Sequence, residues 1–360
     1  MNAHGGVRAA EVVLPCAELE PTLAFFLERL GFRLESISPA DDPAVAVISG
    51  HGVRLRIDRG ARGPAGVLRL ACDDPSTLGD GARELVAPNG TRIELALAEP
   101  TLVLPPVQPA FVHTRGDDAS WVRGRAGMQY RDLIPGRLGG RYLASHIRIP
   151  EGGAVPDYVH FHRVRFQLIY CHRGWVRVVY EDQGPPFVLH AGDCVLQPPE
   201  IRHRVLESSP GLEVIEITCP AAHETCADHE LVLPTPRVRP ERSFGSQRFV
   251  RHEAAEARWR PWRFEGFECR DLGIAAATGG LVSACVARSV AAHTSGPSEI
   301  DAELCFLFVQ RGSVTLEHEG RTEPLAAGDS VVIPARHRHA FIAGSWDLEL
   351  LEVTAPAGAD

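Results

Sequence analysis

Gly192–Pro198 reads Gly-Asp-Cys-Val-Leu-Gln-Pro, and Gly328–Pro334 reads Gly-Asp-Ser-Val-Val-Ile-Pro. The same spacing separates each leading glycine from a later histidine, His203 in the first stretch and His339 in the second. A Gly-Asp pair before an apolar run is typical of a turn that leads into a β-strand. Glycine accepts a positive φ there, and aspartate can hydrogen-bond nearby backbone. The two stretches therefore indicate a β-rich domain that occurs twice.

Landmarks upstream repeat in the same order, which supports an internal duplication. Gly127–Leu133 (GMQYRDL) recurs as Gly266–Leu272 (GFECRDL), and Gly174 recurs as Gly312, each before a strand-like run. The first copy contains short runs of Val, Ile, Leu and Phe between Gly, Pro and Asp turns, which is the pattern of a sandwich or barrel. Its expected strands are Arg141–Ile149, Phe166–Cys171, Trp175–Glu181, Phe187–His190, Cys194–Gln197 and Leu212–Thr218.

The first hundred residues have a different pattern. Glu11–Cys16 predicts a strand, and Pro21–Leu30 predicts an amphipathic helix with Leu and Phe on one face. Leu102–Ala110 is rich in proline, which favours a linker. Further strands are expected at Ala44–Ile48, Val53–Ile57, Val67–Cys72 and Thr91–Leu97.

Composition excludes several classes of function. The net charge of −9 argues against a nucleic-acid surface, which needs a basic patch to neutralise phosphates. The sequence has no lysine, which rules out Schiff-base chemistry and a Walker-type phosphate loop. No run approaches the ~18 apolar residues of a membrane span, and the nine cysteines form no C-x-x-C pair. We therefore expect a cytoplasmic protein with reduced thiols and no membrane partner.

The first copy carries the residues that favour metal chemistry. His160 and His162 alternate in a strand-like run, so both imidazoles project to one face. Gln167 and His203 follow at positions that could complete the set. Three imidazoles and one oxygen donor are a normal ligand set for a divalent first-row metal with open positions.

Residues 125–356 resemble a bicupin, which is two cupin barrels in tandem. The first cupin motif is a glycine, H-x-H, a glutamate and a second glycine, and the second motif is Gly-Asp, a proline and a later histidine. The sequence departs from this pattern in two ways, because the opening spacing is one residue longer and glutamine replaces the glutamate. The matching residues are Gly153, His160, His162, Gln167, Gly174, Gly192, Asp193, Pro198 and His203.

The second copy keeps one of the four expected ligands. The Gly174/Gly312 alignment replaces the first three by Ser298, Ile300 and Cys305, and only His339 is retained. We therefore expect barrel 2 to lack a metal and to serve packing or dimerisation. A shifted alignment would instead gather a different set, namely His293, Glu299, Asp301 and Glu303.

The N-terminal region is similar to the vicinal-oxygen-chelate (glyoxalase-like) fold. Val12–Glu20 and Leu23–Phe32 resemble that family's first strand and helix, and Pro88–Leu95 resembles its terminal strand. Glu94 matches a metal-ligand position, but Glu11 stands near the place of the first-strand histidine. The second βαβββ unit is too short to complete the fold, so we interpret this module as truncated and non-catalytic.

These observations predict a mostly β protein with two tandem cupin (jelly-roll) barrels and a small α+β glyoxalase-like module. The expected boundaries are 8–98 for the module, 99–124 for a Pro-rich linker, 125–222 for barrel 1, 223–262 for an inter-barrel segment and 263–356 for barrel 2.

The cupin resemblance implies an oxygenase-type enzyme that binds one divalent transition metal in barrel 1. Fe(II) is favoured, with Zn, Ni, Mn or Cu as alternatives. Tyr158, Arg165 and Arg202 are candidates to orient substrate or move protons. A site without a carboxylate ligand stays more positive, which favours a carboxylate or enolate substrate. A non-redox isomerase or lyase, and a non-catalytic ligand-binding or sensory bicupin, are the alternatives. We also expect a homodimer.

Overall fold

The computed structural model describes residues 6–117, 120–290 and 294–356, and the chain divides between Thr101 and Leu102. Both units are built mainly from strands, which confirms the predicted fold class. Within the described residues, no helix is long and apolar enough to span a membrane.

The N-terminal unit contains two small sheets around one core. One sheet has the order β1-β4-β3-β2 and the other β5-β7-β6, so the chain order is βαβββ followed by βαββ. The predicted helix begins earlier, at Leu19, and its second half is a π-helical turn over Phe25–Arg29. Its elements are β1 (Val12–Pro15), α1 (Leu19–Ala24), β2 (Arg33–Ser38), β3 (Val45–Gly50), β4 (Val53–Asp58), β5 (Val67–Cys72), α2 (Pro75–Gly79), β6 (Glu84–Val86) and β7 (Arg92–Leu97).

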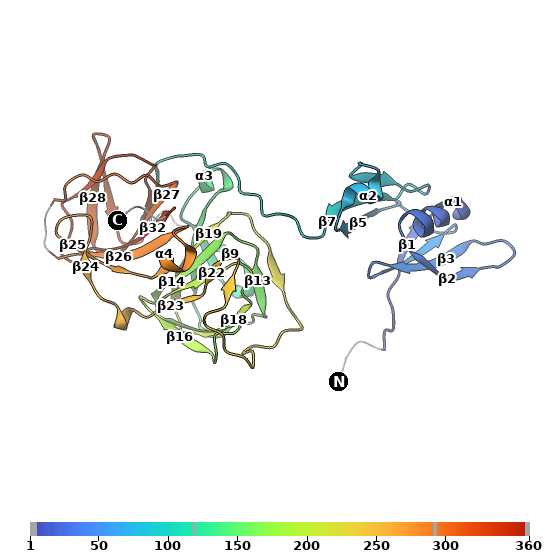
Figure 1. Cartoon of the computed structure of the whole chain (residues 1–360), viewed down its shortest axis with the longest axis horizontal. Helices are drawn as coiled ribbons and strands as arrows, with labels where there is room; N and C mark the ends of the chain where they lie inside the picture. The colour runs from blue at the N-terminus through green and yellow to red at the C-terminus, as the bar shows by residue number, and fades with distance from the viewer. Residues whose placement is uncertain (1–5, 118–119, 291–293, 357–360) are drawn as a thin grey trace. The chain divides into compact units, whose positions relative to one another are not determined.

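Barrel 1 consists of two sheets that face each other around a common interior (Figure 1). Alternate residues of their strands point inward, as the period of two requires. The seven-stranded sheet contains β9 (Val122–Arg123), β10 (Gln129–Asp132), β11 (Leu143–Ile149), β14 (Phe166–Arg173), β17 (Cys194–Gln197), β19 (Leu212–Cys219) and β23 (Val250–His252). The second contains β12 (Gly153–Ala154), β13 (His160–His162), β15 (Trp175–Tyr180), β16 (Phe187–His190), β18 (His203–Ser208) and β20 (Thr225–Ala227).

Barrel 2 repeats this plan with a smaller second sheet. Its seven-stranded sheet has the order β24-β25-β26-β32-β27-β30-β8, and its three-stranded sheet has the order β29-β28-β31. The bounds are β8 (Val112–Thr114), β24 (Arg260–Pro261), β25 (Phe267–Asp271), β26 (Ser283–Ser289), β27 (Leu304–Arg311), β28 (Ser313–His318), β29 (Arg321–Ala326), β30 (Ser330–Val332), β31 (His339–Ile342) and β32 (Glu349–Ala355). Short elements outside these sheets are η2 (Arg125–Gly127), α3 (Arg137–Gly140), β21 (Ser243–Phe244), β22 (Gln247–Arg248), η3 (Ala254–Glu256) and α4 (Ile274–Thr278).

The predicted linker 99–124 and the predicted inter-barrel segment 223–262 both contribute strands to the sheets of the barrels. In segment 99–124, β8 pairs with β30 of barrel 2. In segment 223–262, β23 pairs with β17 of barrel 1, and β20 pairs with β13. Edge strands expose unpaired backbone groups, and each exchanged strand covers one such edge. The proline content signalled an interruption of regular structure but not this pairing.

The repeated sequence landmarks meet where the barrels join. Arg131 donates to the carbonyl of Gly328 at 2.8 Å, and its counterpart Arg270 donates to the carbonyl of Gly192 at 3.0 Å. One core cluster contains residues of both barrels, including Leu168 and Phe306. The Arg-Asp-Leu and Gly-Asp repeats therefore stabilise the joint between the barrels.

Candidate metal site in barrel 1

The three predicted histidine ligands come together inside barrel 1. The β13 strand alternates, so His160 and His162 are buried and Phe161 faces outward, where the Arg202 guanidinium lies 4.0 Å from its ring centre. His160 pairs with His203 across β13 and β18. One possible ligand atom from each histidine lies within 4.8 Å of the others. Among the described residues, this is the one cluster of three or more His, Cys, Asp or Glu side chains that meets this criterion.

Hydrogen bonds fix two of the three imidazoles in an orientation suited to a metal, and the third is compatible with it. Nδ1 of His160 lies 2.8 Å from the Tyr158 carbonyl, and Nδ1 of His203 lies 3.0 Å from the Ile201 carbonyl. A carbonyl can only accept, so these Nδ1 atoms carry the proton and Nε2 keeps the lone pair. Nδ1 of His162 lies 3.2 Å from the Thr225 hydroxyl, which can accept as well. Such outer contacts are typical of metal-binding histidines.

Burial keeps the imidazoles neutral. It lowers the pKa of His162 to about 3, and it lowers the pKa of His203 well below its usual value. Burial and the Arg125 guanidinium lower the pKa of His160 as well. Neutral imidazole is the form that binds a metal, so the donor set fits a divalent ion.

Gln167 lies beside these histidines in a chain of hydrogen bonds. The Tyr180 hydroxyl donates to Gln197 at 2.8 Å, and Gln197 Nε2 lies 3.0 Å from Gln167 Oε1 and 3.2 Å from His203 Nε2. The Gln167 amide in turn donates to Glu216. The Gln167 carbonyl oxygen therefore faces the side of the site on which His203 lies.

Two residues that the sequence interpretation missed hold one edge of the site. Arg125 Nη2 lies 3.0 Å from His160 Nε2, and its Nη1 pairs with Asp157. The Asp157 side chain is fully buried, and its Oδ2 accepts the Val205 amide at 2.9 Å. No spacing rule would have found Arg125, because it belongs to a short irregular segment 35 residues before its partner His160.

Two further cavity residues were also missed. Glu216 is the inward-facing acid of the otherwise apolar middle of β19, and burial raises its pKa. The sequence did contain a signal for Glu216. It lies two residues after Val214 in an apolar strand, so both side chains point to the same, inward face. His223 lies just before β20 with its ring 5.3 Å from that of His162.

The cavity around these groups has a volume of about 490 Å³. None of the three predicted orienting residues lines it, so that prediction needs correction. Tyr158 is 38% exposed, and the guanidinium carbon of Arg125 lies 5.7 Å from the centre of its ring. Arg202 points outward to Asp228 at 3.2 Å because it alternates with His203, and Arg165 lies in the turn before β14.

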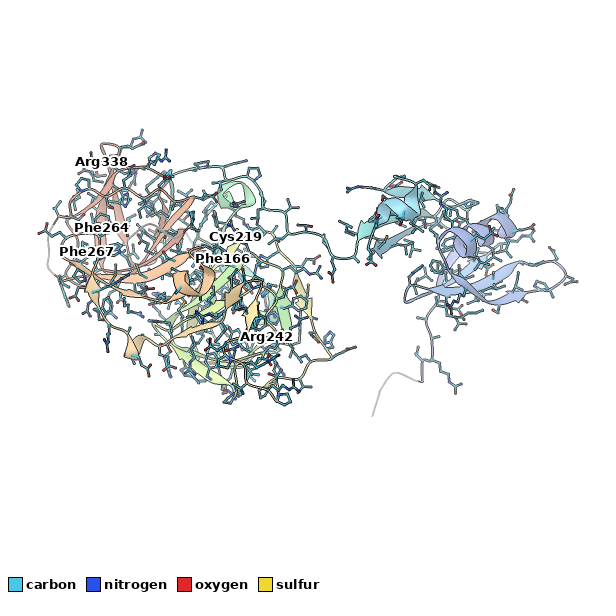
Figure 2. The ribbon with its side chains drawn as sticks, in the orientation of Figure 1. Phe166, Cys219, Arg242, Phe264, Phe267 and Arg338 are labelled. Carbon is cyan, nitrogen blue, oxygen red and sulfur yellow. The ribbon has the colours of Figure 1, made fainter. Side chains whose placement is uncertain are left out.

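The corresponding region of barrel 2 is filled by aromatic rings. His339 forms a bridge with Ser298, as His160 does with His203, which supports the sequence alignment of the two copies. Phe264 and Phe267 lie beside each other (Figure 2), and the Phe341 ring lies 4.8 Å from that of Phe264. All three phenylalanines are almost completely buried.

The alternative ligand set for barrel 2 is dispersed. Asp301 pairs with Arg336 at 2.8 Å, and Glu303 pairs with Arg141 at 3.0 Å. His293 lies outside the described residues. In the N-terminal unit, the Glu94 side chain is 42% exposed beside Arg92, and Glu11 pairs with Arg54.

Comparison with known proteins supports the assignment of the two barrels. The family model Cupin_2, a cupin domain, matches residues 145–217 and 288–354. No match was found among curated protein sequences.

Solved structures with the same architecture include three of different origin. The protein Ylba from E. coli has a TM-score of 0.53 and 11% identity, covering 71% of this chain and 96% of its own. Oxalate decarboxylase OxdC from Bacillus subtilis has a TM-score of 0.51 and 12% identity, covering 72% and 80%. Salicylate 1,2-dioxygenase from Pseudoaminobacter salicylatoxidans has a TM-score of 0.52 and 15% identity, covering 71% and 83%. Two regions of the chain therefore match the cupin domain, and the two barrels together have the fold of these bicupin structures.

Proposed function

We propose that the protein is a metal-dependent enzyme whose barrel 1 acts on a small anionic organic substrate, with an oxygenase-type reaction favoured. The observation that carries this proposal is the convergence of three buried imidazoles within 4.8 Å. His160, His162 and His203 would hold the ion, with the Gln167 carbonyl as a fourth donor. A redox-active ion such as Fe(II) would supply Lewis acidity and a binding site for O₂.

The chain's own residues bind and orient the substrate in this proposal. Arg125 replaces Arg165 and Arg202 as the anion partner, because it lines the cavity next to His160. Asp157 holds Nη1 of its guanidinium, and Nη2 lies 3.0 Å from His160 Nε2, so the Arg125 side chain reaches the edge of the proposed metal position. A guanidinium pairs well with a carboxylate or an enolate. Apolar walls exclude bulk water from the rest of the cavity and strengthen that pairing.

A non-redox isomerase or lyase is the second candidate, and Glu216 favours it. This half-buried carboxylate lines the cavity and accepts from Gln167, so it lies within reach of a substrate held at the same site. A carboxyl group in that position can accept or return a proton without any change of redox state. The homodimer and the cytoplasmic location stay predictions.

Anaerobic loading with Fe(II) or Zn(II), followed by O₂ uptake measurements with a panel of small carboxylic and enolic acids, tests the proposal. We expect substrate-dependent O₂ consumption with Fe(II) only. Turnover with Zn(II) and without O₂ would favour the lyase or isomerase, and ligand binding without turnover would favour a sensory bicupin. Arg125→Gln should weaken binding of the acid, whereas the matched control Arg202→Gln should not.

A further inference from the structure

The barrel 1 cavity has a polar end and an apolar end. Three strands each place an inward polar residue at the level of the histidines. The inward residues farther from the histidines on these strands are apolar, whichever way the chain runs. On β15, Tyr180 is followed by Val178 and Val176, and Tyr180 stacks on His203 with ring centres 5.4 Å apart. On β19, Glu216 is followed by Val214 in the same direction away from the site.

The third strand, β18, has the same arrangement. His203 is followed by Val205, which pairs directly with Val178 across the two strands. All of these valines line the cavity. Strands advance ~3.3 Å per residue, so the first apolar row lies about 6–7 Å from the polar level and the second about 13 Å from it.

The volume exceeds the needs of a two-carbon acid. About 490 Å³ lies within the range of ~300–1,000 Å³ that is typical of pockets for drug-sized ligands. Water gains few hydrogen bonds against valine and leucine walls, and an apolar ligand group releases it favourably. The apolar end is therefore suited to a hydrocarbon group.

Barrel 2 shows how this fold closes the same space. At positions that correspond to Arg125, Met128 and Val205, it carries Phe264, Phe267 and Phe341. These rings pack against one another in the core of barrel 2. Barrel 1 has smaller or more flexible side chains at all three positions, and these leave the chamber open.

We propose that the natural ligand of barrel 1 is an amphipathic acid, with its carboxylate or enolate at the polar end and a hydrocarbon body of several carbons in the apolar end. This inference rests on the proposed function, since the polar end is the proposed metal site. It adds a size and a chemical class to the substrate. The acid group binds beside Arg125, and the body extends toward Val178, Val205 and Val214.

Titration of the Zn(II)-loaded full-length protein with acetate, butyrate, hexanoate and octanoate tests the proposal by calorimetry. Burial of one CH₂ is worth ~0.8 kcal/mol, so Kd should fall about 3–4-fold per added carbon until the chamber is full. Val205→Phe, which copies Phe341, should remove most of this dependence on chain length. Val214→Leu copies Leu350 and should reduce the gain for the longest chains.

Arg204→Phe is the matched control, because it places the same ring on the exposed side of β18. It should leave the whole series unchanged. Equal affinities for all four acids would overturn the inference and leave the proposed enzyme intact. Absence of binding by every acid to protein with a full complement of zinc would overturn both the inference and the anionic-substrate proposal.

Discussion

The two barrels share one fold and differ in what occupies the interior. Barrel 1 has three buried histidines around a cavity of about 490 Å³. Barrel 2 keeps only His339 at these positions and packs Phe264, Phe267 and Phe341 into the corresponding space. The shared Gly-Asp turns and arginines stabilise the joint between the barrels from both sides. The comparison teaches that the repeated Arg and Gly-Asp residues stabilise the shared fold, whereas His160, His162 and Gln167, which only barrel 1 carries, distinguish its candidate site.

The inward-facing acids of the two barrels show the same contrast. Glu216 of barrel 1 and Glu352 of barrel 2 occupy equivalent positions. Arg263 neutralises Glu352 through a contact at 2.5 Å, whereas Glu216 accepts from the neutral amide of Gln167. Barrel 2 therefore completes its polar interior with its own side chains, and barrel 1 leaves groups that a ligand can use.

The largest expected effect is loss of metal from barrel 1. His160→Ala or His162→Ala should abolish metal loading, because two imidazoles cannot hold the ion as the full set does. The protein should stay folded by circular dichroism, since apolar strands carry most of the stability in a chain of this length. His339→Ala is the control and should leave metal content unchanged. Unfolding of either barrel 1 variant would contradict this account.

Opening barrel 2 should cost stability without creating a site. Phe264 is 1% exposed and contacts Phe267, Phe341 and Trp262. Phe264→Ala should lower the free energy of unfolding by about 3–5 kcal/mol, as expected for a large cavity in a core. Chemical denaturation measures the loss of stability. Elemental analysis of the variant should give the same metal content as for the wild type. A second bound ion in this variant would show that packing alone suppresses a site in barrel 2.

Replacing Gln167 tests the charge of the site. Gln167→Glu should tighten metal binding and weaken binding of carboxylate ligands, since the added charge makes the site less positive. Without metal, the new carboxylate would face Glu216 and remove its hydrogen-bond donor, which should cost about 1–3 kcal/mol of stability. Calorimetric titration of small acids and denaturation with and without metal measure these effects. Tighter binding of acids to the variant would remove the charge argument.

The effect confined to acidic pH concerns His339, whose pKa burial lowers to about 4. Its pKa in the unfolded chain is near 6.5, so the unfolded state takes up a proton first on acidification. Stability contributed by the neutral form is therefore present above about pH 6.5 and decreases as the pH falls toward 4. His339→Phe should reduce this slope by up to ~1.4 kcal/mol per pH unit. An unchanged slope in pH-dependent denaturation would show that His339 does not titrate in this way.

The sequence was sufficient for the duplication, the barrels and the histidine cluster, because these depend on local spacing. H-x-H in a strand places two imidazoles on one face, and the repeat relates His203 to a known turn. It was insufficient for Arg125, Asp157 and Glu216, whose places depend on how distant segments pack. The pairing of β8 with barrel 2 and of β23 with barrel 1 could not be predicted for the same reason. Strands so far apart in the sequence leave no local pattern that reveals their pairing.

Metal stoichiometry tests the central difference between the barrels most directly. Elemental analysis should use the full-length protein purified without chelators or a histidine tag, with native mass spectrometry to count ions per chain. We predict one divalent transition metal per chain, lost in His162→Ala and retained in His339→Ala. Two ions per chain, or one ion that survives His162→Ala, would contradict the assignment of the site to barrel 1.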